Sequence, residues 1–329
     1  MDFFAVGDLV VDAFIRLKDA RVHCNIDNEN CEICMRWGDK IPFESSTIVP
    51  AVGNAANAAV AAARLGLPSA LRAYVGGDQW GAQCVASLAA DQVSTDYVEK
   101  QADKKTNYHY VLWYEGQRTI LVKHEEFAYA VPAVADAPKY FYLSSLGENS
   151  LAYHGAWLEQ LKKWPQTKLA FQPGTYQMKF GKEALAEIYR QTYIFFCNKE
   201  EAERILGIEP TQDIKNLLTQ IKALGPKVVV VTDDVRGAYA LDEQNNFWKV
   251  PRYPDPRPPY EITGAGDAFA STTVVALALG KDLKEALKWG ATNASAVLQE
   301  IGAQKGLLNR SQLEKNLANP PAPFDVTPL

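Results

Sequence analysis

The sequence predicts an α/β protein in which helices cover both faces of a mostly parallel central sheet and a small second β-sheet is present. Short apolar strands alternate with helices along most of the 329 residues, which is the pattern of parallel strands joined by crossover helices. Residues 227–232 are nearly continuous valine, as expected of a strand buried on both faces. Two β-rich stretches, at about 13–47 and 105–127, interrupt the alternation and predict the second sheet.

The expected elements follow one another at short intervals. Strands or apolar β-type runs are expected at 3–6, 9–17, 70–75, 108–114, 118–123, 139–143, 168–171, 193–197, 227–232, 237–241 and 247–250. Helices are expected at 54–65, 80–90, 151–163, 182–190, 199–206, 213–224, 267–279 and 283–300. Glu115-Gly116 between two β-rich runs predicts a hairpin. Strands 237–241 and 247–250 are expected to be antiparallel, and the proline-rich tail after Asn316 irregular.

Composition narrows the class of protein. Nearly half of the residues are apolar, at 47%, which supports a sizeable core. A formal net charge of -5 and a pI near 5.5 argue against a broad surface for nucleic acid or for an anionic membrane. The absence of a long apolar run and of an N-terminal signal pattern predicts a cytoplasmic protein. Five cysteines do not make a disulfide framework.

The most informative stretch is 264–267, where a proline-rich loop meets the start of an apolar helix. Backbone N–H groups at a helix start lack partners within the helix and lie at the positive end of its dipole. Because Gly264, Ala265 and Gly266 have little or no side chain, an anion could approach these groups closely. The next residue, Asp267, has two possible roles. It is either a general base beside this anion site or an ordinary first-turn aspartate favoured by the helix dipole.

Turns after strands are the expected places for a ligand, because ligands of parallel sheets bind beyond the carboxyl ends of the strands. These turns contain Gly7-Asp8, Gly76-Gly77-Asp78, Asn198, Thr232-Asp233 and residues 264–267. Segments 1–12, 48–104 and 128–329 are assigned to an α/β core. Segments 13–47 and 105–127 are assigned to a β lid, a common device for excluding water from a reaction. The lid is also the surface expected to form a homodimer.

Several short motifs occur in a fixed order along the chain. They are Gly7-Asp8 with Asp12, Gly53 with Asn57, Asn198-Lys199-Glu200-Glu201, Thr232 with Gly237, Glu261-Ile262-Thr263-Gly264-Ala265-Gly266-Asp267, and Gly302-Ala303. This series resembles that of the ribokinase-like (PfkB) family of carbohydrate and nucleoside kinases. The Gly-Ala-Gly-Asp motif is specific, and the others are weak alone and strong as an ordered set. The resemblance covers nearly the whole chain and implies a three-layer, Rossmann-like ribokinase fold with a β lid.

The resemblance implies transfer of the γ-phosphoryl group of ATP to a hydroxyl group of a small sugar or nucleoside. Asp267 would accept the proton of that hydroxyl, and the N–H groups of Gly264, Ala265 and Gly266 would stabilise charge on the transferring group. Four further residues would bind the substrate at its hydroxyl groups. These are Asp8, Asp12, Gly53 and Asn57.

The same resemblance assigns residues to the nucleotide. Asn198 and Glu201 would order Mg²⁺ at the ATP phosphates, with Glu201 acting through water. Their spacing is equally that of a helix capping box. Thr232 and Gly237 would line the ATP site, and Asn293 would lie beside the adenine.

Three residues depart from the family pattern. Val52 stands where the first Gly of a pair is usual, Asp234 where Gly is common, and Glu261 where Asp is usual at a position linked to a monovalent cation such as K⁺. A non-catalytic sugar- or nucleotide-binding protein on the same fold would explain these departures and stays open as an alternative. An NAD-dependent oxidoreductase is disfavoured, because no Gly-x-Gly-x-x-Gly follows the first strand.

The lid sequence contains a cluster outside the family pattern. His23, Cys24, Cys31 and Cys34 lie within twelve residues, and Cys31-Glu32-Ile33-Cys34 has the spacing of a zinc half-site or of a redox pair. A second half-site is absent from the sequence. Three interpretations remain: a zinc site on Cys24, Cys31 and Cys34, reduced cysteines with a packing role, or a redox switch.

The acceptor substrate is expected to be selected by the lid. The candidate residues are Asn107, Tyr108, His109, Tyr110, Trp113 and Arg118. Aromatic rings could stack on a base or on a sugar face, and Arg118 or Lys123 could pair with a substrate phosphate. We expect an unphosphorylated sugar or nucleoside, and we expect His109 and His124 to pack or to contact the substrate rather than to bind a metal.

Overall fold

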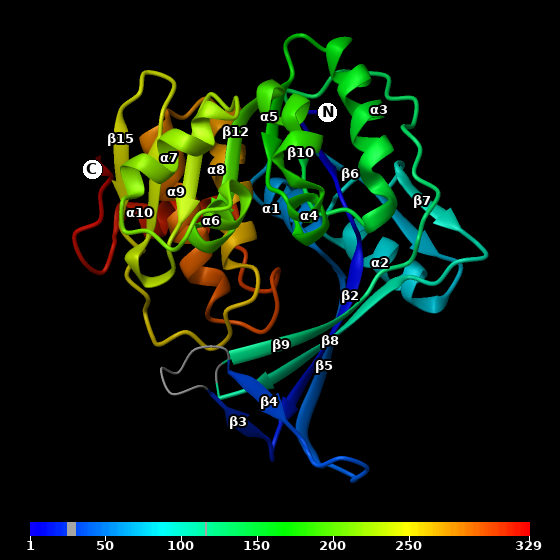
Figure 1. Cartoon of the computed structure of the whole chain (residues 1–329). Helices are drawn as coiled ribbons and strands as arrows, with labels where there is room; N and C mark the ends of the chain where they lie inside the picture. The colour runs from blue at the N-terminus through cyan, green and yellow to red at the C-terminus, as the bar shows by residue number, and fades with distance from the viewer. Residues whose placement is uncertain (25–30, 116) are drawn as a thin grey trace.

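A large twisted sheet forms the centre of the computed structural model, which describes residues 1–24, 31–115 and 117–329 (Figure 1). The strand order across this sheet is β16-β15-β14-β13-β12-β11-β10-β1-β6-β7. The strands are β1 (Phe3–Val6), β6 (Ser69–Gly76), β7 (Val98–Gln101), β10 (Tyr140–Leu143), β11 (Lys168–Phe171), β12 (Thr192–Asn198), β13 (Val228–Thr232), β14 (Ala238–Leu241), β15 (Phe247–Val250) and β16 (Thr327–Pro328). In this sheet the neighbouring strands β7, β6, β1, β10, β11, β12 and β13 run parallel. The pairings from β13 through β14 and β15 to β16 are antiparallel, as predicted for β14 and β15.

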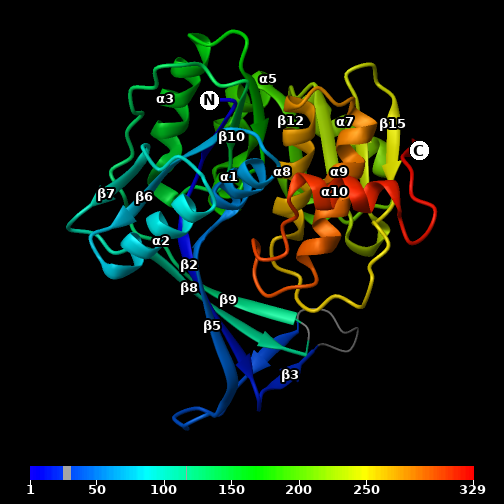
Figure 2. The same ribbon diagram turned by 180° about the vertical axis from the view of Figure 1, so that it is seen from behind.

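Helices cover both faces of the sheet, as Figures 1 and 2 show from opposite sides. One face carries α1 (Asn54–Arg64), α2 (Gln79–Ala90), α8 (Ala265–Ala278), α9 (Leu283–Val297) and α10 (Arg310–Ala318). The other face carries α3 (Leu151–Lys162), α4 (Thr175–Ala184), α5 (Ala186–Gln191), α6 (Lys199–Leu206) and α7 (Ile214–Ala223). In β13, Val228 and Val230 join the first apolar cluster, whereas Val229 and Val231 join the second. The predicted burial of this strand on both faces is therefore confirmed.

The close approach of α1 to α8 positions the centre of the site. Helix α1 is rich in alanine, and its buried face is made of Ala55, Ala56, Ala58 and Ala59 beside Asn57. The facing helix α8 is also built mainly from small residues. Because small side chains let two helix backbones come close together, a polar group on α1 can reach the first turn of α8.

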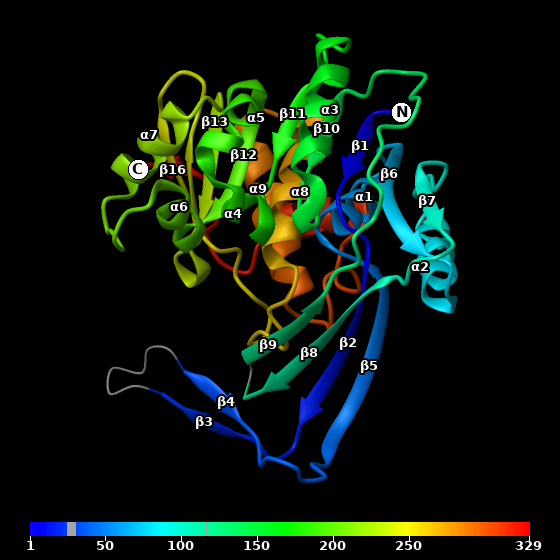
Figure 3. The same cartoon turned by 45° about the vertical axis from the view of Figure 1, so that its right-hand side comes forward.

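The second sheet extends away from the core and consists of strands in the order β5-β2-β8-β9 (Figure 3). The strands are β2 (Val10–Leu17), β5 (Phe43–Val52), β8 (Asn107–Tyr114) and β9 (Gln117–Lys123). Strand β2 pairs with β8 in parallel and with β5 in antiparallel orientation, so the two stretches that interrupt the alternation lie in one sheet. Strands β8 and β9 form the expected hairpin, with Tyr114 opposite Gln117.

The cysteines of the zinc prediction lie in or next to a separate two-stranded sheet, and their state corrects that prediction. Strands β3 (Arg21–His23) and β4 (Glu32–Cys34) form a small hairpin, and a disulfide joins Cys24 to Cys31. This bond removes both residues as thiolate ligands and also contradicts fully reduced lid cysteines. Cys34 is an exposed free thiol. Within the described residues, no group of three or more His, Cys, Asp or Glu side chains could hold a metal ion.

Two further elements differ from expectation. The C-terminal tail returns to the sheet, where Thr327 and Pro328 pair with β15 instead of remaining irregular. The helix expected at 182–190 is part of two helices, α4 and α5, and a positive φ of 84° at Gly181 interrupts α4. No helix in the described part of the chain is long and apolar enough to cross a membrane.

Candidate active site

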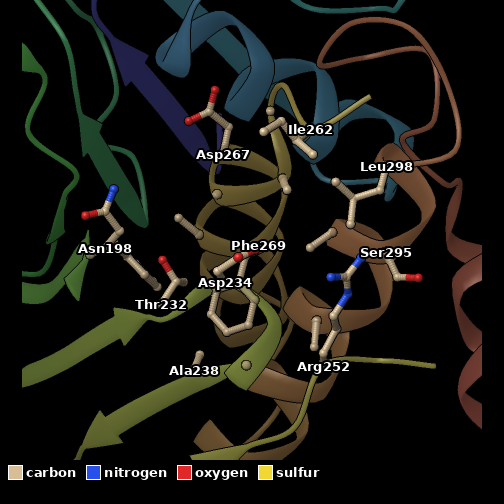
Figure 4. Close-up of a pocket in the computed structure, with 18 of the residues that line it drawn as sticks. Asn198, Thr232, Asp234, Ala238, Arg252, Ile262, Asp267, Phe269, Ser295 and Leu298 are labelled. Carbon is tan, nitrogen blue, oxygen red and sulfur yellow. The ribbon is translucent and has the colours of Figure 1, made fainter. Parts of the chain in front are cut away.

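A cavity of about 520 Å³ lies where β12 and β13 end and α8 begins (Figure 4). The predicted site residues that line it are Asn198, Glu201, Thr232, Gly237, Gly264, Ala265, Gly266 and Asp267. Arg118 from β9 lines the same cavity, so the second sheet contributes to it directly. In Figure 4, Asp267 stands at the upper end, and Arg252 and Ser295 lie toward the opposite end. Of the five turns expected from the sequence, those that contain Asn198, Thr232 and residues 264–267 therefore meet at this cavity.

Asp267 is held by two amide side chains. Asn57 donates from Nδ2 to Asp267 Oδ2 at 2.7 Å, and Gln172 donates from Nε2 to Asp267 Oδ1 at 3.0 Å. Each amide is oriented in turn, because Gln304 Nε2 donates to Asn57 Oδ1 at 2.9 Å and the Tyr142 hydroxyl donates to Gln172 Oε1. These partners direct both NH₂ groups toward the carboxylate, which fixes its orientation.

The surroundings of Asp267 also set its basicity. Removal of the carboxylate from water raises its pKa above the ordinary aspartate value, while the hydrogen bonds from Asn57 and Gln172 and the charge of Arg118 act in the opposite direction. The nearby charge of Asp12 raises the pKa further. A carboxylate with a raised pKa is a stronger proton acceptor than an exposed aspartate.

The backbone at the start of α8 is shaped by Gly264. This residue has a φ of 83°, and a Cβ atom placed on it would lie 2.3 Å from the Cβ of Ala303. Gly264 is therefore required both by backbone conformation and by the close approach of the loop around Ala303. A Cβ on Gly266 would meet no atom within 4 Å. In the predicted anion cradle, Gly264 therefore packs against protein, whereas Gly266 has free space around it.

Glu261 ties this loop to the neighbouring one. Its Oε1 accepts hydrogen bonds from the backbone N–H of Thr263 at 2.8 Å and from the Thr263 hydroxyl at 2.6 Å. Its Oε2 accepts from the backbone N–H of Gly302 at 3.3 Å, and Arg118 Nη1 lies 3.9 Å from Oε1. Both carboxylate oxygens of this buried residue are thus engaged by protein groups.

Asn198 and Glu201 form the capping box at the start of α6. Glu201 N–H donates to Asn198 Oδ1 at 2.7 Å, and Asn198 N–H donates to Glu201 Oε2 at 2.8 Å. Burial raises the pKa of Glu201, the hydrogen bond from Asn198 lowers it, and the charge of Asp267 raises it. The capping interpretation is confirmed, and both residues also line the cavity.

The far end of the cavity lies against β14 and α9. Gly237 has a φ of 91°, and a Cβ on it would lie 2.1 Å from the carbonyl oxygen of Val250, so a side chain has no room there. Asp234 lines the cavity with a positive φ of 45°. Arg252 forms an ion pair with Asp255, whose carboxylate also accepts a hydrogen bond from Ser295.

Asn293 does not line this cavity. It is fully buried, and its Nδ2 donates to Thr272 Oγ1 at 2.8 Å while its Oδ1 accepts from the N–H of Leu308 at 2.9 Å. These bonds tie α9 to α8 and to the loop before α10. Asn293 thus has a structural role, and its position beside the adenine stays a prediction.

None of the predicted substrate residues lines the cavity, although Asn57 donates a hydrogen bond to Asp267. Asp12 is close enough for its charge to raise the pKa of Asp267, and Gly53 immediately precedes α1. Asp12 Oδ1 lies 3.3 Å from His109 Nδ1, and Asp8 accepts a hydrogen bond from the Tyr129 hydroxyl at 3.1 Å. The two aspartates therefore belong to a polar cluster on the lid side of the site.

Three residues of the hydrogen-bond network around Asp267 were missed from the sequence: Tyr142, Gln172 and Gln304. Gln172 directly follows β11, so the strand-end argument could have identified it. Gln304 follows the Gly302-Ala303 motif but carries no signal of its own. Tyr142 lies inside an apolar strand and is fully buried, and nothing in its sequence context distinguishes it from a core residue.

The mostly parallel sheet, covered by helices on both faces and with a cavity at the carboxyl ends of its strands, places the protein in the α/β class whose ligands bind at that edge. Within that class, the chain belongs to the pfkB family of carbohydrate kinases, whose family model matches residues 45–310. It is 26% identical over 305 residues to the ribokinase of Bacillus subtilis, covering 85% of this chain and 92% of that protein. It is 25% identical over 269 residues to a nucleoside kinase of Methanothermobacter thermautotrophicus, covering 80% and 83% of the two chains.

Solved structures show the same fold. Arabidopsis thaliana ribokinase complexed with ribose and ATP superposes with a TM-score of 0.77 at 20% identity, covering 96% of this chain and 98% of that one. The nucleoside kinase of Methanocaldococcus jannaschii gives a TM-score of 0.75 at 19% identity, with the same coverage. The predicted ribokinase-like fold and family are confirmed.

Proposed function

We propose that this protein is an ATP-dependent kinase that phosphorylates a hydroxyl group of a small sugar or nucleoside. The observation that carries this proposal is the Asp267 carboxylate, which is desolvated, oriented by two amides and placed in the first turn of α8 beside the anion cradle. The names of the relatives support the same chemistry, since they include a ribokinase and a nucleoside kinase.

In this mechanism Asp267 takes the proton of the acceptor hydroxyl as that oxygen attacks the γ-phosphoryl group. The first N–H groups of α8 have no partner within the helix, and they stabilise the negative charge on the transferring group. Asn57 already donates to Asp267 and accepts from Gln304. We therefore assign Asn57 first to positioning the base, and Asp12 and Asp8 to binding substrate hydroxyls.

The nucleotide lies along the cavity, past Thr232 and Gly237 toward Arg252 and Ser295. This direction is supported by the shape of the cavity, which runs from Asp267 to α9. The complex of Arabidopsis ribokinase with ribose and ATP supports the choice of nucleotide.

Mg²⁺ would be held near Glu201. The capping box uses one carboxylate oxygen of Glu201, so the other can bind a water molecule of the hydrated ion, which fits the preference of Mg²⁺ for few direct protein ligands. The ion would neutralise phosphate charge. At Glu261 both oxygens already accept hydrogen bonds, so we assign this residue to holding the cradle loop rather than to a K⁺ site.

A coupled assay of ADP release over a panel of sugars and nucleosides tests this proposal. We expect turnover with at least one acceptor and loss of that turnover in Asp267→Asn. Saturable binding of a sugar or of ATP by calorimetry, with no ADP released from any acceptor, would favour the non-catalytic binding protein instead.

A further inference from the structure

Two histidines meet at the lid side of the site. His109 lies in β8, and His124 follows β9, so the hairpin register brings them together. Their Nε2 atoms are 3.3 Å apart, and both rings are largely buried. A carboxylate oxygen lies near each Nδ1 atom, with Asp12 Oδ1 at 3.3 Å from His109 and Asp8 Oδ2 at 3.1 Å from His124.

The positions of the ring protons decide what this contact is. Its geometry allows a hydrogen bond in which one Nε2 donates to the other. A proton on each Nδ1, beside the carboxylates, instead leaves the Nε2 lone pairs of His109 and His124 facing each other across 3.3 Å. Two acceptors at this separation repel each other unless a positive charge lies between them.

The separation matches a metal ion. Nitrogen ligands about 2.0–2.1 Å from a tetrahedral zinc ion lie about 3.3–3.4 Å from each other. Imidazole is a preferred ligand of zinc, and histidine ligands commonly donate their second N–H to a carboxylate. We propose that His109 and His124 bind a divalent metal ion of the zinc type through Nε2, with Asp12 and Asp8 as the carboxylates that orient the two rings.

The proposed metal site has only two protein ligands, so the ion keeps further coordination positions. No third His, Cys, Asp or Glu completes a metal-binding group among the described residues, so water fills the remaining positions. Where the proposed kinase function also holds, oxygen atoms of the acceptor replace that water, and the metal becomes part of substrate recognition. Metal binding itself uses neither Asp267 nor the anion cradle and does not depend on turnover.

Three further side chains surround the pair of histidines: Asp8, Tyr129 and Tyr176. Asp8 Oδ2 and His124 Nδ1 are buried and close, yet their angle does not make a hydrogen bond. The ring of Tyr176 packs edge-on against His124 at 5.7 Å between centroids, and the Tyr129 hydroxyl holds the other oxygen of Asp8.

The test is a metal titration of the purified, metal-free full chain without nucleotide. The parent for this experiment is the double variant His23→Ala/Cys34→Ser, which removes the exposed histidine and thiol at the lid tip. At about pH 8, where imidazole is mostly unprotonated, Co²⁺ is added and its visible absorption is recorded, and Zn²⁺ is then used to displace it. We expect saturation at one metal ion per chain and a tetrahedral Co²⁺ spectrum.

Variants in this background assign the ligands. His109→Ala and His124→Ala should each weaken Zn²⁺ binding at least about 10-fold, and Asp12→Asn, which changes only the orienting carboxylate, should weaken it about 10–100-fold. Thermal melting establishes that each variant is folded. Two results would overturn the proposal. The first is a folded parent with no saturable metal binding, which would mean that the two Nε2 atoms share a proton. The second is metal binding that survives in the double variant His109→Ala/His124→Ala. Metal binding with no ADP release from any acceptor would reject the proposed kinase activity and would still support the proposed metal site.

Discussion

The core side and the lid side of the site are built differently. On the core side, Asp267 is fixed by amides from α1 and from the end of β11, and these amides are fixed by further buried partners. On the lid side, Arg118, His109 and Asp12 lie on a sheet that has one face against the site and another exposed to solvent. If the proposed function holds, buried hydrogen bonds position the base, while residues of a sheet with one exposed face contact the acceptor.

The largest effect is expected from Asp267→Asn, which removes the base and keeps its shape. Turnover should fall by about 10²–10⁴-fold, the usual contribution of a general base. The measurement is kcat by ADP release, with ATP binding by calorimetry as the control for an intact nucleotide site. A variant as fast as the parent would reject the role of Asp267.

A matched pair of glycine substitutions compares the packed and open ends of the cradle. In Gly264→Ala, the positive φ and the 2.3 Å approach to Ala303 force the loop to move, which should cost about 1–3 kcal/mol of stability and lower kcat. Gly266→Ala meets no protein atom and should leave the melting temperature within a few degrees of the parent. Equal melting temperatures for the two variants would contradict this account of the cradle.

The pH profile should respond to the amides on the core side. Asp267 must be ionised to accept a proton, so activity falls as pH drops through its raised pKa. The hydrogen bond from Gln172 lowers that pKa, and Gln172→Ala should raise it. The acidic limb of kcat/KM against pH should therefore move to higher pH. An unchanged limb in a folded variant would show that Gln172 does not tune the base.

The smallest effect on catalysis is expected on the exposed face of the lid. Ile48, Ala13, Tyr110 and Leu121 form a row across the four strands, and the side chains of Ile48, Tyr110 and Leu121 are about half exposed. The lid is expected from the sequence to form a homodimer, and a second copy of the chain would then pack on this row. Leu121→Lys should convert a dimer to a monomer in light scattering with little change in melting temperature.

The matched control for the lid is Leu151→Lys, which places the same charge on α3 of the core at a similar exposure. It should leave the mass in solution unchanged. A parent chain that is already monomeric at all concentrations would refute the dimer.

Local patterns were sufficient for much of the fold. The valine run of β13, the alternation of strands and helices and the capping box of Asn198 and Glu201 depend on neighbours a few residues apart. The 264–267 motif likewise depends on local backbone, so its place at a helix start could be predicted. The pairing of Cys24 with Cys31 was missed because the spacing of Cys31 and Cys34 suggested a different partner.

By itself, the sequence determined the fold class, the family and the chemical types gathered at the strand ends. Only the tertiary structure decided which amides hold Asp267, because Asn57 lies 210 positions away and Gln172 lies 95 positions away in the chain. It also decided that His109 and His124 face each other with an aspartate behind each ring. Such contacts follow from helix packing and strand register, which no short stretch of sequence encodes alone.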